Sequence, residues 1–92
     1  MINSFRCAET QAIFEGFGSR KFRNVELAAK RRLDYLNASR SLAQLAQLRG
    51  NRLEALKGDR WGQYSIRVND QYRICFEWWD GGAYNVEIVD YH

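Results

Sequence analysis

Five side chains of this 92-residue sequence are of types that can transfer protons or bind phosphate. Lys57 lies in a glycine-containing loop, Arg73 lies alone among apolar neighbours, and Asp90, Tyr91 and His92 are its last three residues. His92 is the only histidine, and its ordinary pKa lies near neutrality, so it can exchange a proton at physiological pH. Arginine presents a planar fork of donors that suits phosphate oxygens.

Motifs of several common enzyme classes are missing from the sequence. It contains no phosphate-binding glycine loop, zinc-ligand spacing, dinucleotide fingerprint or serine nucleophile elbow. Two cysteines and one histidine cannot form an ordinary structural zinc site unless carboxylates complete it. We therefore expect no metal and no other cofactor.

Positive charge is concentrated in the middle of the sequence. Residues 20–60 carry 11 basic and 4 acidic side chains (+7), whereas residues 61–92 carry 2 and 5 (−3). Eleven of the fourteen cations are arginine, which favours a polyanionic partner. Charge alone is equally consistent with a solvated helix face.

Length and composition predict one domain spanning residues 1–92. With 46% hydrophobic residues the sequence can pack a core, but the length leaves no room for a second one. No window approaches the roughly 20 apolar residues of a membrane span, and the start lacks the pattern of a secretory signal. We expect a cytoplasmic protein without membrane contact, in which Cys7 and Cys75 are reduced.

Apolar spacing predicts three helices in the first half of the sequence. They are expected over residues 8–17, 25–36 and 42–48. Asn24 is a plausible cap for the second helix, and Ser41 for the third.

After residue 50 the apolar period changes to two, which predicts three antiparallel strands over residues 64–68, 72–78 and 83–89. Strand alternation sorts the side chains into two faces. The face toward the helices should carry Tyr72, Ile74, Phe76, Tyr84, Val86 and Ile88. The other face should carry Arg67, Arg73, Cys75, Glu77, Asn85, Glu87 and Tyr91. The predicted fold is α+β, with helices on one face of a small antiparallel sheet and a polar face open to a partner.

Four stretches give the sequence a family resemblance. They are the Met-Ile-x-Ser-Phe start, Leu-x-x-Leu-Lys-Gly-Asp-Arg, Ser-Ile-Arg-Val-Asn-Asp-Gln-Tyr-Arg-Ile-Cys-Phe and the terminal Asp-Tyr-His. Their order and spacing resemble the HigB branch (plasmid-maintenance killer proteins) of the RelE/ParE toxin superfamily, and GraT-type members in particular. The resemblance covers essentially the whole sequence and implies a RelE-like sheet with helices on one face.

The resemblance also implies an activity and partners. HigB toxins of type II toxin–antitoxin modules are ribosome-dependent endoribonucleases that cut messenger RNA in the ribosomal A site. A HigA-type helix-turn-helix antitoxin neutralises them, and operator DNA is bound only through the toxin–antitoxin complex. The 2′-hydroxyl of the RNA attacks the adjacent phosphorus, so the protein must accept a proton, stabilise charge and donate a proton.

Matching positions carry the family's roles into this sequence. Arg73 and Lys57 would hold the scissile phosphate and stabilise its charge. Asp90 and His92 are the acid–base candidates, and Tyr91 would stack on or hydrogen-bond a base. His92 could equally be a frayed terminal residue.

Three of these residues have a structural alternative as well. Lys57 could simply be solvated in its loop. Arg73 could form an ion pair across the sheet with Glu77 or Glu87. Asp90 shares the strand parity of residue 88 and could cap the core instead of contacting RNA.

The sequence departs from the family pattern at Glu54. Relatives can carry a histidine three residues before the loop lysine Lys57. A carboxylate there would repel phosphate, and it can donate a proton only if its pKa is raised. We therefore expect weaker cleavage than in a relative with two histidines.

Surface roles can be assigned to two further groups of residues. Phosphate contacts to ribosomal RNA, or contacts to an acidic antitoxin, would suit the middle arginines: Arg23, Arg31, Arg32, Arg49, Arg52 and Arg60. Trp61, Trp78 and Trp79 are interpreted as core or core-edge residues, with an antitoxin contact as the alternative.

Three other functions remain open on the same scaffold. The ParE branch inhibits DNA gyrase and has no RNA-cleaving site, although Arg73 and the terminal Asp-Tyr-His argue against it. A non-catalytic module could block the ribosome or bind nucleic acid through its arginines. A structural or interaction-only role would require that overexpression leave growth unchanged.

Overall fold

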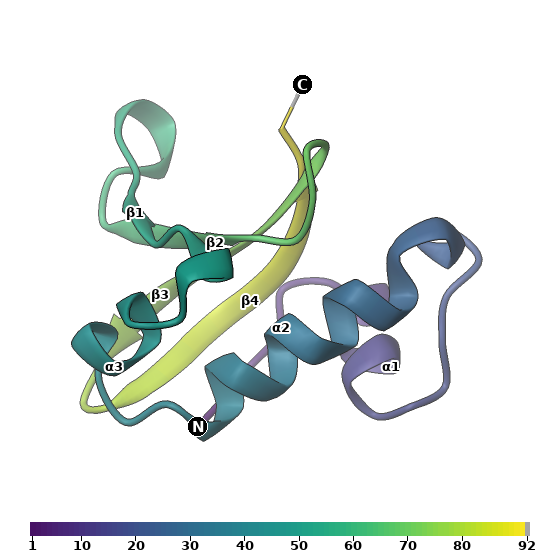
Figure 1. Ribbon diagram of the computed structural model, residues 1–92, viewed down its shortest axis with the longest axis horizontal. Helices are drawn as coiled ribbons and strands as arrows, with labels where there is room; N and C mark the ends of the chain where they lie inside the picture. Colours follow the sequence, from purple (N-terminus) through teal and green to yellow (C-terminus); the bar gives the residue numbers. More distant parts are fainter. Residues whose placement is uncertain (92) are drawn as a thin grey trace.

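The computed structural model describes residues 1–91 and consists of helices packed on one face of a four-stranded antiparallel sheet (Figure 1). The strands are β1 (Glu54–Ala55), β2 (Gln63–Arg67), β3 (Tyr72–Trp79) and β4 (Gly82–Asp90), paired in the order β1-β2-β3-β4. This arrangement confirms the predicted α+β class and the three predicted strands. The two-residue strand β1 was not predicted, because two exposed side chains show no alternation.

Three α-helices precede the sheet, close to their predicted positions. They are α1 (Ala8–Phe14), α2 (Glu26–Ala38) and α3 (Leu42–Ala46), with short 3-10 turns η1 (Arg23–Val25), η2 (Arg49–Asn51) and η3 (Gly58–Arg60). Ser41 caps α3 as expected, since its side chain accepts a hydrogen bond from the Gln44 N–H at 3.0 Å. The predicted cap Asn24 lies inside η1 instead, so α2 begins without a side-chain cap.

The helices bury the apolar side chains of one sheet face, which we call the covered face. The alternating residues Ile66, Ile74 and Phe76 have no exposed surface and pack with Leu33 and Leu36 of α2. The full set of buried core residues is Ile13, Phe22, Val25, Ala29, Leu33, Leu36, Leu45, Ile66, Val68, Ile74, Phe76, Ala83, Val86 and Ile88. Hydrophobic burial on this face therefore fixes the orientation of the sheet.

A β-bulge in β4 corrects one predicted face assignment. Asn85 has a left-handed φ of 54°, and the pairing register between β3 and β4 shifts beside it. Tyr84 consequently lies opposite Glu77, on the face away from the helices, and Ala83 takes the buried position. The Tyr84 ring stacks on Trp79 with centroids 3.7 Å apart. The bulge breaks the strict alternation on which the prediction relied.

The N-terminal segment and the first turn of α1 cover the outer edge of β4. Ile2 and Phe5 form parallel bridges to β4, and the hydroxyl of Thr10 accepts a hydrogen bond from the Ile88 N–H at 3.0 Å. These contacts occupy backbone groups that a free edge strand would expose to another chain. Among residues 1–91, every helix is too short or too polar to cross a lipid bilayer.

Candidate functional site

The sheet face away from the helices, which we call the open face, carries a polar row across all four strands. Backbone pairing places Glu54, Ser65, Cys75 and Glu87 side by side in that order. Arg73 lies beside this row, two residues before Cys75 on the same strand. The predicted polar face is therefore present, and the short strand β1 extends it by one residue.

Arg73 is the most buried charged residue of this face. Only 8% of its surface is exposed. Its Nε donates to the Ser65 hydroxyl at 2.6 Å, and its Nη2 donates to the Arg52 carbonyl at 2.6 Å and to the Ser65 carbonyl at 3.3 Å. Nη1 lies 3.9 Å from the Glu54 carboxylate. The expected ion-pair alternatives, Glu77 and Glu87, do not contact it, so Glu54 is its acidic partner within residues 1–91.

Tyr91 completes the surroundings of this guanidinium. The ring of Tyr91 is exposed, and its centroid lies 5.8 Å from Cζ of Arg73. Cation–π attraction over such a distance favours a ring lying above the guanidinium. The structure thus brings together Arg73, Tyr91 and Glu54, three of the residues that the sequence singled out.

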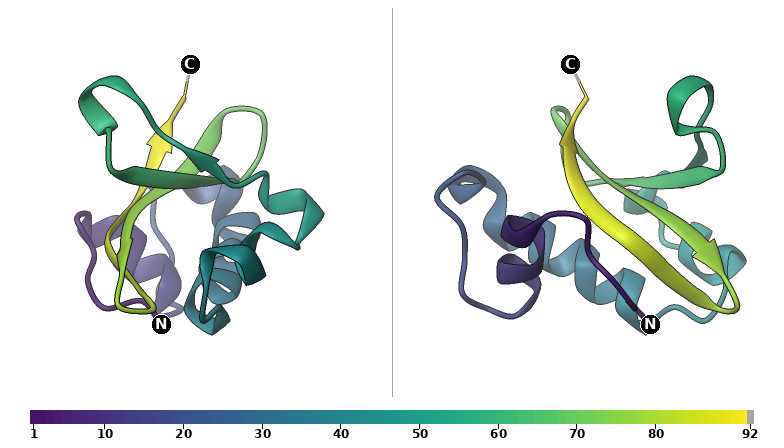
Figure 2. Two further views of the ribbon diagram at one scale, coloured as in Figure 1. Left: turned by 90° about the vertical axis from the view of Figure 1, so that its left-hand side faces the viewer. Right: turned by 180° about the vertical axis from the view of Figure 1, so that it is seen from behind.

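Lys57 lies at the same end of the molecule as Tyr91. It precedes η3 in the connection between β1 and β2, and this connection and the end of β4 extend at the same end (Figure 2). Lys57 is exposed, and its ammonium has no partner among residues 1–91. Its positive charge is therefore available to an incoming anion.

The last two acid–base candidates are placed differently. Asp90 ends β4 and is exposed, and its carboxylate accepts a hydrogen bond from Gln71 Nε2 at 3.0 Å. Asp90 pairs with Tyr72, so its side chain lies on the same side of β4 as Ile88 and on the opposite side from Tyr91. Because it is exposed, it does not pack into the core. His92 lies outside the described residues.

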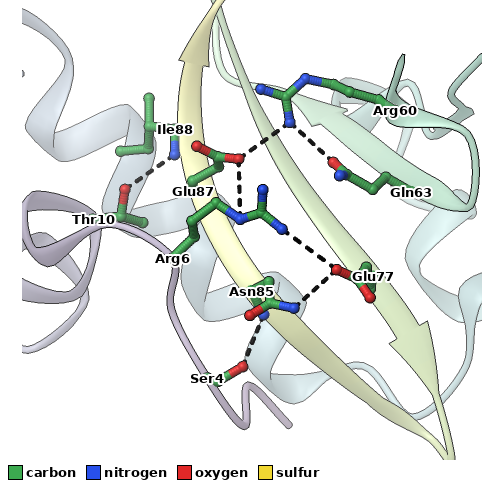
Figure 3. Close-up of polar contacts among 9 residues, drawn as sticks. All are labelled: Ser4, Arg6, Thr10, Arg60, Gln63, Glu77, Asn85, Glu87 and Ile88. Atoms are coloured by element: carbon green, nitrogen blue, oxygen red, sulfur yellow. Dashed lines mark hydrogen bonds and ion pairs between the residues drawn. The ribbon is translucent and has the colours of Figure 1, made fainter. Parts of the chain in front are cut away.

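A network of ion pairs covers the middle of the open face (Figure 3). Nη1 of Arg60 donates to Glu87 at 3.1 Å and to Gln63 at 3.0 Å, so the end of η3 is fixed to β2 and β4. Arg6 approaches from the N-terminal segment and lies 3.7 Å from Glu87 and 3.6 Å from Glu77. Glu87 therefore joins two arginines from distant parts of the sequence.

This network changes the pKa of two groups. Burial raises the pKa of the Cys75 thiol, and the Glu87 carboxylate raises it further, although Arg60 and Arg73 oppose the change. Burial is the largest single influence on Arg60 and lowers its pKa, but the hydrogen bond to Glu87 and the nearby Cys75, Glu87 and Tyr91 together raise it more, so the net pKa is raised. Cys75 is therefore a protonated thiol at neutral pH, and Arg60 is a permanent cation.

The six arginines assigned to RNA do not form one continuous surface. Arg23 and Arg31 are exposed on the helix layer. Arg32 donates to the buried side chain of Asn51 at 2.9 Å and thereby joins α2 to η2. Arg60 is engaged with Glu87 on the open face, while Arg49 and Arg52 are exposed just before β1.

The three tryptophans have different environments. Trp78 packs against the core and meets Phe76 edge to face, as expected for a core-edge residue. Trp79 is 48% exposed, and Trp61 is 82% exposed in the β1–β2 connection. The core interpretation is therefore wrong for Trp61, because apolar composition alone does not distinguish a loop tip from a core edge.

Sequence reasoning missed several residues that build this site. Ser65 and Arg6 carried no recognisable signal, because their roles depend on cross-strand neighbours. A cross-strand pairing of the predicted strands would have placed Ser65 opposite Cys75. Within residues 1–91, no three His, Cys, Asp or Glu side chains gather in a way that could hold a metal ion.

Comparison with known proteins places this architecture in a family. A family model described as the RelE-like toxin of the type II toxin-antitoxin system HigB matches residues 13–92. Toxin HigB-1 of Vibrio cholerae is 45% identical over 62 residues, which is 67% of this chain and 65% of that protein. Endoribonuclease HigB of Proteus vulgaris is 38% identical over 61 residues, which is 64% of this chain and 66% of that protein. Each match spans just under two thirds of the relative's own length.

The fold has a counterpart among solved structures. A chain of the YoeB-YefM complex from Staphylococcus aureus superposes with a TM-score of 0.57, covering 100% of this chain and 98% of that chain at 17% identity. This likeness supports the RelE-like fold, whereas the family model covers most of the sequence itself. The chain therefore belongs to the HigB family of RelE-like toxins.

Proposed function

We propose that this chain is the toxin of a type II toxin–antitoxin module and cleaves messenger RNA in the ribosomal A site. Family membership supports the toxin assignment. The relative named Endoribonuclease HigB supports RNA cleavage as the activity. Inhibition of translation and of growth follows from loss of intact message.

The observation that carries this proposal is the setting of Arg73. Its guanidinium is almost buried and held by Ser65 and the Arg52 carbonyl, and the exposed ring of Tyr91 lies 5.8 Å from its Cζ. A cation fixed in advance at low solvent exposure stabilises developing phosphate charge without reorganising during the reaction. Tyr91 offers an aromatic surface for a base beside it.

The reaction needs no more than proton transfer and charge stabilisation. The 2′-hydroxyl loses its proton and attacks the adjacent phosphorus, the bond to the 5′-oxygen breaks, and that oxygen takes up a proton. His92 and Asp90 are proposed as the acid–base residues, which for Asp90 requires that the end of β4 turn its side chain toward the open face when RNA binds. Arg73 and Lys57 are proposed to hold the phosphate and to stabilise its extra charge in the transition state.

Glu54 is expected to weaken this reaction. Its carboxylate is the acidic partner of Arg73, 3.9 Å from Nη1, and is itself exposed. An incoming phosphate must therefore displace a carboxylate, which adds a repulsive contact and an exchange of partners. At this position relatives can carry a histidine, which could both accept and donate a proton.

The proposed partners follow the same assignment. A HigA-type helix-turn-helix antitoxin is proposed to neutralise the toxin, and operator DNA would be bound only by the complex of the two. The exposed arginines Arg23, Arg31, Arg49 and Arg52 are proposed to contact phosphates of ribosomal RNA. Arg32 and Arg60 already have partners within the chain and would contribute less. The proposed location is the cytoplasm, where translating ribosomes are found.

The test is to add purified protein to a defined message with and without translating ribosomes and to map cut ends by primer extension. We expect cuts only with ribosomes, within the A-site codon, and none with His92→Ala. Ribosome binding without cuts would favour a blocking protein instead. Neither cuts nor ribosome binding, together with inhibition of DNA supercoiling, would favour the gyrase inhibitor.

A further inference from the structure

Trp61 is the most exposed tryptophan of the described residues, and the proposed reaction does not use it. With 82% of its surface in solvent, the ring contributes almost nothing to the core. It lies at the end of η3 in the connection between β1 and β2, here called the 56–63 loop. This loop also contains Lys57 and extends at the end of the molecule where Tyr91 lies (Figure 2).

The 56–63 loop is held in one shape although its tip is exposed. Leu56 is buried, and its N–H donates to the Gln63 carbonyl at 2.9 Å, which closes the base of the loop. Arg60 points inward to Gln63 and Glu87 (Figure 3). The Trp61 N–H donates to the Gly58 carbonyl at 3.0 Å. Two inward side chains therefore anchor the loop, while Lys57 and Trp61 are left exposed.

Open space borders this exposed pair. Gly58, the first residue of η3, and Gly62, just after it, have left-handed φ values of 62° and 94°, which allow the tight turns at these positions. A Cβ built on either glycine would meet no atom within 4 Å. A flat partner can therefore approach the loop without meeting a neighbouring side chain at these two positions.

The chemistry around Trp61 fits RNA better than a protein partner. Protein interfaces surround a tryptophan anchor with further apolar contacts that exclude water. The exposed neighbours of Trp61 in the loop are charged, Lys57 and Asp59, and its buried apolar anchor Leu56 points inward. An aromatic ring beside a free cation, by contrast, is the usual platform for an unstacked base and its phosphate.

We propose that Trp61 stacks on an unpaired RNA base when the protein is bound to the ribosome, with Lys57 contacting the adjoining backbone. This inference rests on the proposed function. If the base belongs to the message, the adjoining backbone is that of the scissile phosphate which Lys57 is proposed to hold. If the base belongs to ribosomal RNA, Trp61 stacks on it while Lys57 remains on the message. Glu87 acts as a positioning residue in this arrangement, because it holds Arg60 and thereby the loop.

The experiment measures equilibrium binding to ribosomes that carry a message with 2′-deoxynucleotides in the A-site codon, which removes the attacking hydroxyl. Trp61→Ala is expected to weaken binding about tenfold, because stacking contributes roughly 1–3 kcal/mol per base. Trp61→Phe should bind within about threefold of the wild type, since an aromatic face remains. Trp61→Leu should behave like Trp61→Ala, because it is apolar but cannot stack.

A matched control is available at the opposite end of the sheet. Trp79→Ala removes a half-exposed tryptophan next to the β3–β4 turn and should leave ribosome affinity within about twofold of the wild type. Thermal unfolding of Trp61→Ala should match the wild type, since its ring is not part of the core. Ribosomes without message separate the two sources of the base: a defect that persists there assigns it to ribosomal RNA, and a defect seen only with message assigns it to the message.

The inference is overturned if Trp61→Ala binds these ribosomes like the wild type, or if Trp61→Leu restores binding fully. It is also overturned if Trp61→Ala keeps its ribosome affinity but escapes neutralisation by the antitoxin, because the ring would then belong to a protein interface. The proposed function is judged separately, by whether the wild type cuts an all-ribose message. A wild type that binds but does not cut would end that proposal alone.

Discussion

The covered face and the open face of the same sheet are stabilised in different ways. On the covered face, Leu33, Ile74 and Phe76 are fully buried among hydrocarbon neighbours, where many small contacts add up. On the open face, the nearly buried Arg73 depends on a few directed bonds to Ser65 and the Arg52 carbonyl. Stability is thus concentrated on one face and fixed charge on the other.

This division explains how a chain of 92 residues can carry a charged site. A small domain has little stability to spare, and a buried cation costs free energy unless its donors are satisfied. The row beside Arg73 supplies those acceptors from strands that the covered face already holds in register. Variants of the two faces should therefore separate loss of stability from loss of activity.

The largest effect on stability is expected on the covered face. Leu33→Ala leaves a cavity in the packed core and should lower the free energy of unfolding by about 2–5 kcal/mol. Leu27→Ala, on the same helix but 87% exposed, should change it by less than about 0.5 kcal/mol. Urea unfolding of both variants measures the difference. Equal losses would mean that α2 does not pack on the sheet as described.

The next largest effect is expected on the open face, at Glu54. Glu54→His removes the carboxylate partner of Arg73 and adds a group that can exchange a proton, so cleavage of ribosome-bound message should rise about tenfold or more. Glu54→Gln removes the charge alone and should give a smaller rise. Single-turnover rates measure both. An unchanged or lower rate in Glu54→His would contradict the account of this position.

A smaller effect is expected where the open face holds the 56–63 loop. Glu87→Gln keeps the shape of the side chain but weakens its bonds to Arg60 and Arg6, at a cost of about 1 kcal/mol. Hydrogen exchange at the Trp61 amide should then be about fivefold faster. Glu77→Gln is the matched control, because Glu77 contacts Arg6 but not Arg60. Equal acceleration of hydrogen exchange in both variants would show that the contact between Glu87 and Arg60 does not hold the 56–63 loop in place.

The smallest effect concerns the buried thiol of the open face. Because burial raises the pKa of Cys75 above its ordinary value of 9.0, the unfolded thiol ionises first as the pH rises. Its contribution to stability is fully present below pH 9.0 and is lost as the pH rises through the folded-state pKa. Between pH 7 and pH 10 the wild type should lose more stability than Cys75→Ala. Urea unfolding measures the free energy of unfolding of both proteins at each pH. Equal losses in the wild type and in Cys75→Ala would show that the thiol is not buried in solution.

The sequence predicted the covered face better than the open one. Alternation in β3 identified Ile74 and Phe76, because burial of one face imposes a period of two on the residues. The same rule failed at Tyr84, where the bulge at Asn85 changes the parity of β4. A bulge depends on local backbone geometry and on contacts such as the hydrogen bond that the Asn85 N–H donates to the Ser4 hydroxyl. Neither of these produces a periodic pattern in the sequence.

The roles proposed for the site residues come from the resemblance rather than from a pattern in the sequence. Arg73 was identified in this way, but its partners Ser65 and Glu54 could be named only after the strands were paired. Glu87 was one of two partners considered in the structural alternative for Arg73, and it instead binds Arg60. Ion-pair partners of this kind depend on distances between side chains of different strands. Residue spacing along one strand does not determine these distances.

The most direct test of a separate functional face is the cleavage rate of Arg73→Lys on programmed ribosomes, under conditions where the variant is folded. Lysine keeps the charge but cannot reproduce the guanidinium bonds to Ser65 and the Arg52 carbonyl. We predict a loss of about 10²–10³-fold in the single-turnover rate, while folded Leu33→Val cleaves like the wild type. An Arg73→Lys rate within twofold of the wild type would contradict the claim that this fixed guanidinium carries the reaction.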